Sequence, residues 1–239
     1  MAPNLVLLHG FTNTGASWDG VISALPERYR AVAPDIRGHG AASGVRPVAL
    51  ADVVGDVSAA ATEPFELAGY SMGGRLALHV ALTLTGRVRR LVLIGASPGI
   101  ADPGERARRR EADDRLADEV ERMTIEAFAQ RWAQTAVLAD QPEAARATVH
   151  RDRLRSTPAG LAAALRGLGT GALPSLWERL GELEGPVDLV VGERDAKFRA
   201  TAEEMAVALR AGRIHVVAGA GHAVHLEAPA AVAKVIAAG

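Results

Sequence analysis

Three residues far apart in this sequence carry the side chains of a serine-based catalytic triad: Ser71, Asp195 and His222. A serine hydroxyl is hardly ionised at neutral pH, so a neighbouring imidazole must accept its proton. A carboxylate then fixes the tautomer of that imidazole and stabilises the cation that forms. We therefore predict that Ser71 is activated by His222, and that Asp195 orients His222.

The residues around Ser71 fit a sharp turn between a strand and a helix. The stretch Gly69-Tyr70-Ser71-Met72-Gly73 matches the pattern Gly-x-Ser-x-Gly, follows the apolar run 65–68 and opens the helical run 75–82. Glycine at the first and last positions of the pattern removes side chains that would collide in so tight a turn. The N-terminus of the following helix favours negative charge that develops near the serine.

The acid and the base both follow predicted strands. Asp195 lies just past one strand, and His222 lies on a glycine-rich loop past the last one. Three rivals remain in the sequence. His225 begins a predicted helix, where packing or capping is expected; Asp188 begins its strand, at the wrong end of the sheet; Glu193 is close to Asp195 but off the motif.

The elements that must position these residues alternate between short apolar strands and helical stretches. This alternation predicts an α/β fold with a mostly parallel sheet whose strands are buried on both faces. The predicted strands span 5–8, 30–36, 65–70, 90–95, 187–191 and 214–217, and the first helices span 17–25, 48–62 and 72–85.

A long helical stretch interrupts this alternation. We expect residues 98–184 to form a helical cap between two parts of one α/β core, 1–97 and 185–239. A cap at that place would cover the carboxyl ends of the strands, where ligands bind in open α/β sheets. Its predicted helices are 103–120, 124–132, 142–154, 158–168 and 175–183.

The composition of the chain indicates which kinds of binding partner to expect. The 239 residues carry a formal net charge of -1 and are 49% hydrophobic, so we expect no nucleic-acid or membrane partner. The chain has no cysteine, and its seven histidines lack the spacing of metal ligands, so neither a metal nor another cofactor is expected. No signal peptide or spanning segment is visible, which predicts a cytoplasmic protein that is a monomer or homodimer.

These motifs resemble the α/β-hydrolase superfamily over nearly the whole chain, in the order Ser…Asp…His. The resemblance implies a sheet of about six strands with helices on both faces and a cap insertion. Further details are similar to the SHCHC synthase family (2-succinyl-6-hydroxy-2,4-cyclohexadiene-1-carboxylate synthases) of menaquinone biosynthesis. The matching stretches are 69–75, Ser97-Pro98-Gly99-Ile100, Gly192-Glu193-Arg194-Asp195-Ala196-Lys197-Phe198 and Gly221-His222, with 105–110, Trp132, 154–156, 169–171 and 175–177 in the cap.

The resemblance assigns further roles by position in these motifs. After the first strand, the backbone N–H of Phe11 would form an oxyanion hole with that of Met72. Arginines would hold substrate carboxylates, and aromatic side chains would line the pocket. The substrate-binding residues implied in this way are Tyr70, Arg75, Arg109, Trp132, Arg155 and Phe198.

Elementary chemistry agrees with part of this assignment. Arg75 follows Ser71 by four residues, so both side chains project from one face of a helix. A guanidinium at that place suits a carboxylate, which it binds bidentately, better than a neutral ester. The alternatives are that Arg75 pairs with an acid elsewhere and that Trp132 is a core aromatic. The sequence also leaves open which of Arg106, Arg108, Arg109 and Arg110 points into the pocket, with Arg108 the main rival of Arg109.

The family resemblance implies a lyase that eliminates pyruvate from SEPHCHC, a cyclohexene that bears succinyl and enolpyruvyl groups. The triad would act as a base on a small polycarboxylate substrate. The alternative is a serine hydrolase, a carboxylesterase or C–C bond hydrolase, since the same triad performs that chemistry. A ligand receptor without activity is disfavoured because the serine, acid and base positions are all filled.

Overall fold

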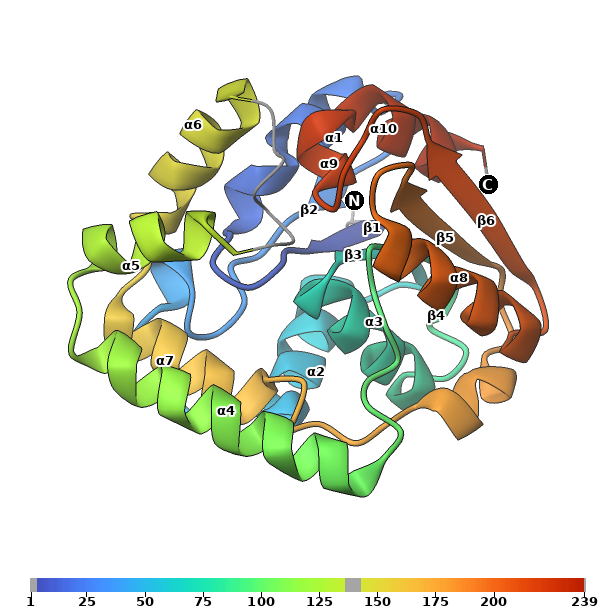
Figure 1. The fold of residues 1–239 in the computed structure, drawn as a ribbon. Coiled ribbons are helices and arrows are strands. Elements are labelled where there is room, and N and C mark those ends of the chain that lie inside the picture. The colour runs from blue at the N-terminus through green and yellow to red at the C-terminus, as the bar shows by residue number, and fades with distance from the viewer. Residues whose placement is uncertain (1–3, 136–142, 239) are drawn as a thin grey trace.

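One parallel sheet forms the centre of the molecule. The computed structural model describes residues 4–135 and 143–238, and within them six strands follow the order β2-β1-β3-β4-β5-β6 with parallel pairing throughout (Figure 1). This confirms the predicted α/β class and sheet size. The strands are β1 (Leu5–Leu8), β2 (Ala31–Val32), β3 (Phe65–Tyr70), β4 (Val88–Ile94), β5 (Val187–Gly192) and β6 (Gly212–Val217).

Helices cover both faces of this sheet. Leu5 and Leu7 of β1 pack on one face, and Val6 and Leu8 pack on the other, as the two-residue period of a strand requires. The first face is covered by α1 (Asp19–Ala24) and α10 (Pro229–Ala237). The second is covered by α2 (Leu50–Ala60), α3 (Met72–Thr83) and α8 (Ala196–Ala208), while η1 (Gly15–Trp18), η2 (Gly40–Ala42) and α9 (Val224–Glu227) are short turns in loops.

Strand β2 is shorter than the predicted 30–36. Pro34 lacks a backbone N–H, so the chain cannot continue the ladder through that position. The next residue, Asp35, instead turns its carboxylate toward loop backbone and accepts hydrogen bonds from the N–H groups of Gly15 and Ala41, both at 2.7 Å. Asp35 therefore holds two loop segments in place instead of extending the strand.

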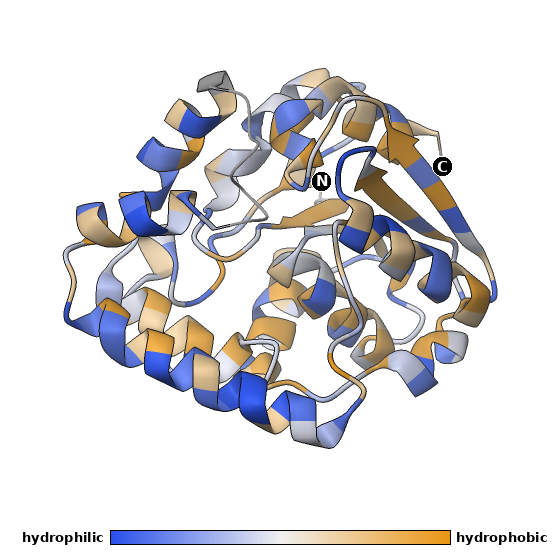
Figure 2. Ribbon diagram, in the orientation of Figure 1, coloured by the Kyte–Doolittle hydropathy of each residue, from blue (hydrophilic) through white to orange (hydrophobic). Residues whose placement is uncertain are grey.

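The described chain between β4 and β5 is helical, as the sequence predicted. Helices α4 and α7 lie side by side, with α5 next to α6, and α4 is mainly hydrophilic toward the outside (Figures 1 and 2). Ala117 and Val120 of α4 pack against Leu161 and Leu165 of α7. The elements are α4 (Pro103–Glu121), α5 (Ile125–Ala133), α6 (Glu143–Arg153), α7 (Pro158–Leu168) and η3 (Trp177–Glu182).

Two glycines bring helix α7 into direct contact with backbone of the α/β core. A Cβ on Gly160 would lie 2.6 Å from the carbonyl oxygen of Gly38, and one on Gly167 would lie 1.8 Å from that of Val48. Both distances are too short for a real Cβ, so any larger residue would force the backbones apart. The helix therefore packs backbone to backbone against loops of the α/β core at two points.

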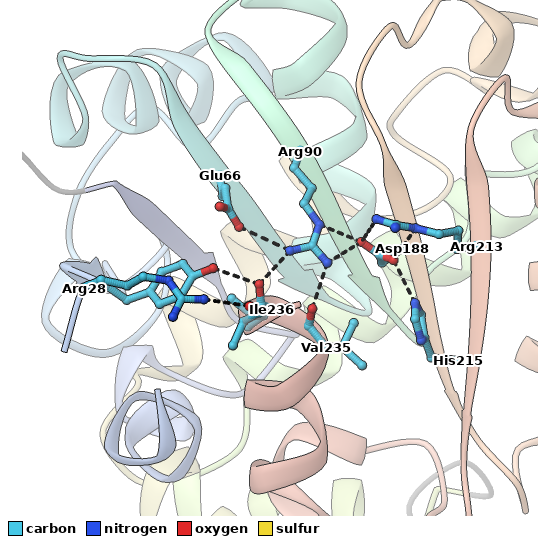
Figure 3. Close-up of polar contacts among 10 residues, drawn as sticks. Arg28, Glu66, Arg90, Asp188, Arg213, His215, Val235 and Ile236 are labelled. Atoms are coloured by element: carbon cyan, nitrogen blue, oxygen red, sulfur yellow. Dashed lines mark hydrogen bonds and ion pairs between the residues drawn. The ribbon is translucent and has the colours of Figure 1, made fainter. Parts of the chain in front are cut away.

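A buried arginine ties the C-terminal helix to the sheet at the edge away from Ser71 (Figure 3). Arg90 of β4 donates from Nε to Asp188 Oδ2 at 2.7 Å, and from Nη1 and Nη2 to the carbonyl oxygens of Ile236 and Val235 at 2.6 and 2.7 Å. Glu66 lies 3.5 Å from Nη1. These carbonyls end α10, so Arg90 satisfies groups that have no partner within the helix.

Asp188 is fully buried and has cations on two sides. Besides Arg90, its carboxylate contacts Arg213 Nε at 3.0 Å and His215 Nε2 at 2.7 Å, both from the neighbouring strand β6 (Figure 3). This explains why Asp188 is not the triad acid. It lies at the start of β5, where these side chains bind its carboxylate, and Ser71 lies at the opposite end of the strands.

Candidate active site

Ser71 occupies a strained turn between β3 and α3. Its φ is +51°, a conformation that residues other than glycine rarely adopt. Space for the turn comes from glycine, because a Cβ on Gly69 would lie 2.4 Å from the carbonyl oxygen of Gly73, and one on Gly73 would lie 2.1 Å from that of Leu8. The serine hydroxyl is thereby presented at the carboxyl edge of the sheet, directly before the N-terminus of α3.

Ser71, His222 and Asp195 lie in one hydrogen-bonded chain. His222 Nδ1 is 2.7 Å from Asp195 Oδ2, and His222 Nε2 is 3.3 Å from Ser71 Oγ. A carboxylate only accepts, so Nδ1 carries the proton and Nε2 is free to accept from the serine hydroxyl. The three side chains predicted from the sequence are therefore in the geometry that removes a proton from Ser71.

The loops that carry the acid and the base are fixed by local contacts. Asp195 caps α8, since its Oδ1 accepts from the N–H of Phe198 at 3.3 Å. Glu227 accepts from the N–H groups of Gly221 and Ala223 at 2.8 and 3.2 Å, on either side of His222. These contacts fix the imidazole and the carboxylate relative to each other. The sequence analysis had given Glu227 no role.

The rival acid and the rival histidine have other positions. Glu193 is exposed and accepts from the N–H of Gly219 at 2.8 Å. His225 is buried, with its ring 4.1 Å from that of Tyr70 and 4.9 Å from that of Trp18. Burial, together with the smaller effects of the nearby His222 and His9, lowers the pKa of His225 to about 3. His225 is therefore a neutral packing residue, as the sequence suggested.

The two predicted oxyanion-hole residues flank Ser71. Met72 is the first residue of α3, so its N–H has no partner within the helix. Phe11 lies in the loop after β1 and, like Met72 and Ser71, lines the same cavity. The next residue, Thr12, has a φ of +69° and directs the chain sharply away. The two residues thus come from separate parts of the chain, the loop after β1 and the start of α3, and line one space.

That cavity, of about 430 Å³, lies between the carboxyl edge of the sheet and the helices α4, α5 and α7. Its walls mix apolar groups with cations and one carboxylate. A smaller space of about 60 Å³ adjoins it, because Phe11, Ser71, Trp132 and His222 line both. The lining residues with charged or aromatic side chains are Phe11, Arg75, Arg109, Asp113, Trp132, Trp177, Lys197, Phe198 and His222.

Arg75 is buried beside Ser71 without an acid of its own. Its Nη2 donates to the carbonyl oxygen of Leu168 at 3.0 Å, and its Nε has no hydrogen-bond partner among the described residues. Burial and the nearby charge of Arg109 lower the pKa of Arg75 to about 10, although Asp113 raises it, and the side chain stays protonated at neutral pH. A buried cation with a bare donor suits an anionic ligand.

The structure places Arg109, among the four neighbouring arginines of α4, at the cavity. Its Nε donates to Asp113 Oδ1 at 2.8 Å, one turn along the helix. Arg109 is exposed, as are Arg108 and Arg110, but of the four arginines it alone lines the cavity, and Arg106 reaches the carbonyl oxygen of Ile100 at 3.4 Å. Arg109 is thus held at the cavity wall by a carboxylate.

The three predicted aromatic residues also lie at the site. Trp132 packs edge-on against Phe11 with ring centroids 5.1 Å apart, so it both lines the cavity and joins the core of the helices. Phe198 and Tyr70 flank the imidazole of His222 at 4.5 and 5.2 Å. Lys197, beside Phe198, lines the cavity as well, although the sequence analysis used it only as a motif residue.

Arg155 does not join the site, which corrects the sequence prediction. It lies beyond the end of α6, is exposed, and lines hollows with Asp19 and Ala16 away from Ser71. The arginine that reaches the site is Arg153, the last residue of α6, which is buried and lines the smaller space with Ser71. Burial lowers the pKa of Arg153 to about 10.

A signal for Arg153 existed in the sequence. Val149 and Arg153 are four residues apart and therefore share one face of α6, and both are buried toward the site. The motif match selected Arg155 by its position in the stretch 154–156 and did not consider which side chains of the preceding helix are buried. Helical spacing from an apolar neighbour would have chosen position 153.

Comparison with known proteins shows which family the chain belongs to. Residues 5–235 match the model of the alpha/beta hydrolase family. The chain therefore belongs to that family. Among the described residues no helix is long and apolar enough to cross a membrane, and no group of histidine and acidic side chains there has the arrangement of a metal site.

Curated relatives and solved structures narrow the class. A Bacillus subtilis protein assigned as 2-succinyl-6-hydroxy-2,4-cyclohexadiene-1-carboxylate synthase is 38% identical over 97% of this chain and 88% of its own length. A Salmonella heidelberg protein with that name is 34% identical over 97% and 91%. MenH from S. aureus has a TM-score of 0.91 at 29% identity, covering 99% of this chain and 93% of that one. By sequence the chain groups with the SHCHC synthases.

A solved esterase is also similar. The thermophilic esterase from Thermogutta terrifontis, described as malate bound, has a TM-score of 0.84 at 25% identity, covering 97% of this chain and 87% of that one. The fold is thus shared between proteins named as synthases and a protein described as an esterase. The distinction between the two chemistries rests on the cavity.

Proposed function

We propose that this chain is an SHCHC synthase, which eliminates pyruvate from SEPHCHC. The observation that carries the proposal is a protonated, buried Arg75 in the cavity onto which Ser71 opens, with an Nε that has no partner among residues 4–135 and 143–238. The relatives named SHCHC synthase support the same reading. A substrate with several carboxylates has anionic groups for Arg75, Arg109 and other cations of the wall.

Ser71 acts as the base in this proposal. His222 takes the proton from the Ser71 hydroxyl, and the serine oxygen takes the proton from the ring carbon next to the succinyl ketone. Negative charge develops on the ketone oxygen, where the N–H groups of Phe11 and Met72 stabilise it. The C–O bond to the enolpyruvyl group then breaks, and the leaving oxygen takes the proton held by His222, so that pyruvate departs as its enol and the triad returns to its starting protonation state. No water attack and no acyl-enzyme are needed.

The cations orient the ring for this proton transfer. We assign one substrate carboxylate to Arg75 and Arg109, which line the larger cavity, and another to Arg153 in place of Arg155. Trp132, Phe198 and Tyr70 supply aromatic surface beside the imidazole. Held at fixed distances, the acidic carbon lies near Ser71 for a large fraction of the time, which lowers the entropic part of the barrier.

Residues 98–184 serve as the cap in this proposal, with 1–97 and 185–239 as the two parts of the core. Arg109, Trp132 and Arg153 all come from helices of that segment, whereas Ser71 and Arg75 come from the core. Substrate binding between them would exclude water and strengthen the electrostatic interactions of the site.

A serine hydrolase is the second candidate, favoured by the similarity to the Thermogutta terrifontis esterase. A coupled assay separates the two. The purified chain is expected to release one pyruvate per SEPHCHC consumed, with only slow hydrolysis of small neutral esters. Rapid ester hydrolysis without pyruvate release would replace the lyase proposal with the hydrolase.

A further inference from the structure

One carboxylate of helix α6 is bonded to the loop that follows β1. Asp152 Oδ2 accepts from the N–H of Thr14 at 2.8 Å and lies 3.5 Å from Asn13 Nδ2, while Oδ1 accepts from the Thr14 hydroxyl. Asp152, Asn13 and Thr14 are all buried. Residues 138 positions apart in sequence are therefore joined by hydrogen bonds between largely buried groups.

The neighbouring residue reaches the same loop from the same helix end. Arg153 Nε donates to Thr12 Oγ1 at 3.2 Å, so consecutive residues of α6 contact Thr12 and Thr14. Between these contacts the loop holds an unusual conformation, because Thr12 has a φ of +69°. A non-glycine residue keeps such a conformation only when its surroundings fix it.

This loop also carries the donor proposed for the oxyanion. Phe11 immediately precedes Thr12, and the N–H of Asn13 closes a turn around both by donating to the carbonyl oxygen of Gly10 at 3.1 Å. The direction of the Phe11 N–H is therefore set by the loop that Asp152 holds. The direction of the Arg153 guanidinium is set by the same helix end.

We propose that Asp152 is a positioning residue, which fixes the Phe11 N–H and the Arg153 side chain relative to Ser71. The part that concerns Arg153 and substrate rests on the proposed function, whereas the part that concerns the Phe11 N–H does not. A group of this kind matters because a displacement of about 1 Å can cost roughly 100-fold in rate.

The fold does not depend on Asp152 to place this loop near the sheet. Asp35, from the core, already holds the N–H of Gly15 at 2.7 Å, one residue beyond Thr14. Asp152 adds contacts from the opposite side of the cavity, on the residues nearest to Phe11. Its removal should therefore loosen the loop locally and leave the core folded.

The test measures how fast a fluorophosphonate labels Ser71, since its phosphoryl oxygen needs the oxyanion donors. We expect Asp152→Ala to slow labelling about 10- to 100-fold. Asp152→Asn keeps an acceptor for the Thr14 N–H, so its labelling rate should lie between the rates of Asp152→Ala and the wild type. The matched control is Asp188→Asn, another buried carboxylate, which should lower thermal stability but leave labelling within about twofold.

Two outcomes would overturn the proposal: labelling of Asp152→Ala at the wild-type rate, or equal slowing in Asp152→Ala and Asp188→Asn at equal loss of stability. If Asp152→Ala does not fold, Thr14→Val removes only the hydroxyl donor. Slower labelling of Thr14→Val, restored by Thr14→Ser, supports the proposal, and labelling of Thr14→Val at the wild-type rate overturns it.

The pyruvate assay is kept separate from this comparison. A wild-type chain that labels readily but releases no pyruvate from SEPHCHC would refute the proposed function and leave the labelling comparison intact. In a chain that does release pyruvate, Asp152→Ala should also raise KM, because the Arg153 guanidinium is no longer held in place.

Discussion

One arginine is buried near the amino ends of the strands and another near their carboxyl ends, but the two arginines have different partners. At the edge away from Ser71, Arg90 donates from Nε, Nη1 and Nη2 to a carboxylate and two helix-ending carbonyls. At the catalytic edge, Arg75 reaches one carbonyl, and its Nε has no partner in the described part of the chain. One guanidinium is satisfied within the chain, and the other retains a donor for a ligand.

This difference separates stability from function. A buried charge whose partners are all in place is costly to disturb, because removal of one partner leaves another charge unpaired. A buried charge without a full set of partners contributes little to folding and is free to bind an anion. Substitutions at the two edges should therefore affect different measurements.

The largest effect is expected at Ser71. Replacement of Ser71 by Ala removes the group that transfers the proton, so pyruvate release should fall by at least about 10⁴-fold. Alanine experiences the same backbone strain at this turn, so the free energy of unfolding should stay within about 0.5 kcal/mol of the wild type. Substantial residual turnover would exclude Ser71 as the base.

Arg90 should show the reverse pattern. Arg90→Met keeps much of the apolar stem but leaves Asp188 and the ends of α10 without their main donor. The free energy of unfolding measured with urea should fall by about 3–5 kcal/mol. Pyruvate release at a temperature where the variant is folded should remain within about twofold of the wild type. A loss of activity without loss of stability would contradict the comparison.

Arg75 gives the next largest effect, on activity alone. Arg75→Met should lower kcat/KM for SEPHCHC by about 30-fold, which corresponds to one charge-assisted hydrogen-bond contact of about 2 kcal/mol. Hydrolysis of a small neutral ester should change far less, and thermal stability should be unchanged or higher, because a desolvated cation is gone. Equal losses on the two substrates would refute the carboxylate role of Arg75.

The smallest expected effect is the pH dependence of the contribution that Asp188 makes to stability. Burial raises the pKa of Asp188, but hydrogen bonds from His215 and Arg90 and the charge of Arg213 outweigh it, so the pKa lies below its ordinary value of 3.8. A carboxyl with a lowered pKa stabilises the fold above its unfolded pKa, and this contribution is lost as the pH falls through the folded one.

Urea unfolding of the wild type and of Asp188→Asn measures this contribution. The difference in the free energy of unfolding between them should be present at pH 5 and should shrink below about pH 4. A difference that stays constant down to pH 2.5 would show that the charge of Asp188 is not what stabilises this edge.

The sequence predicted the fold, and it predicted that Ser71, Asp195 and His222 lie together, because local patterns determine where these residues fall. The apolar runs specify the buried strands, and Ser71, Asp195 and His222 each follow a strand at its carboxyl end, so the topology brings them together. Strand β3 has the predicted bounds, 65–70, and helix α7 has the predicted bounds, 158–168.

The cap residues were harder to predict because their direction depends on helix packing. Arg109 was chosen from four near neighbours by motif, and the structure shows that it faces the cavity with Asp113. Arg155 was wrong because two residues of shift carry a side chain around a helix end, from the buried face to the surface. Contacts such as that of Asp152 with Thr14 leave no local pattern at all.

The glycine contacts of α7 restrict how the space above Ser71 can open. At Gly160 and Gly167 the helix lies directly against loop backbone, with no side chains between them that could slide or repack. A helix seated in this way separates from the core only by breaking close van der Waals contact along its length. If substrate enters the cavity as proposed, α7 is therefore expected to stay in place as a fixed wall, and any opening is expected in the other helices between β4 and β5.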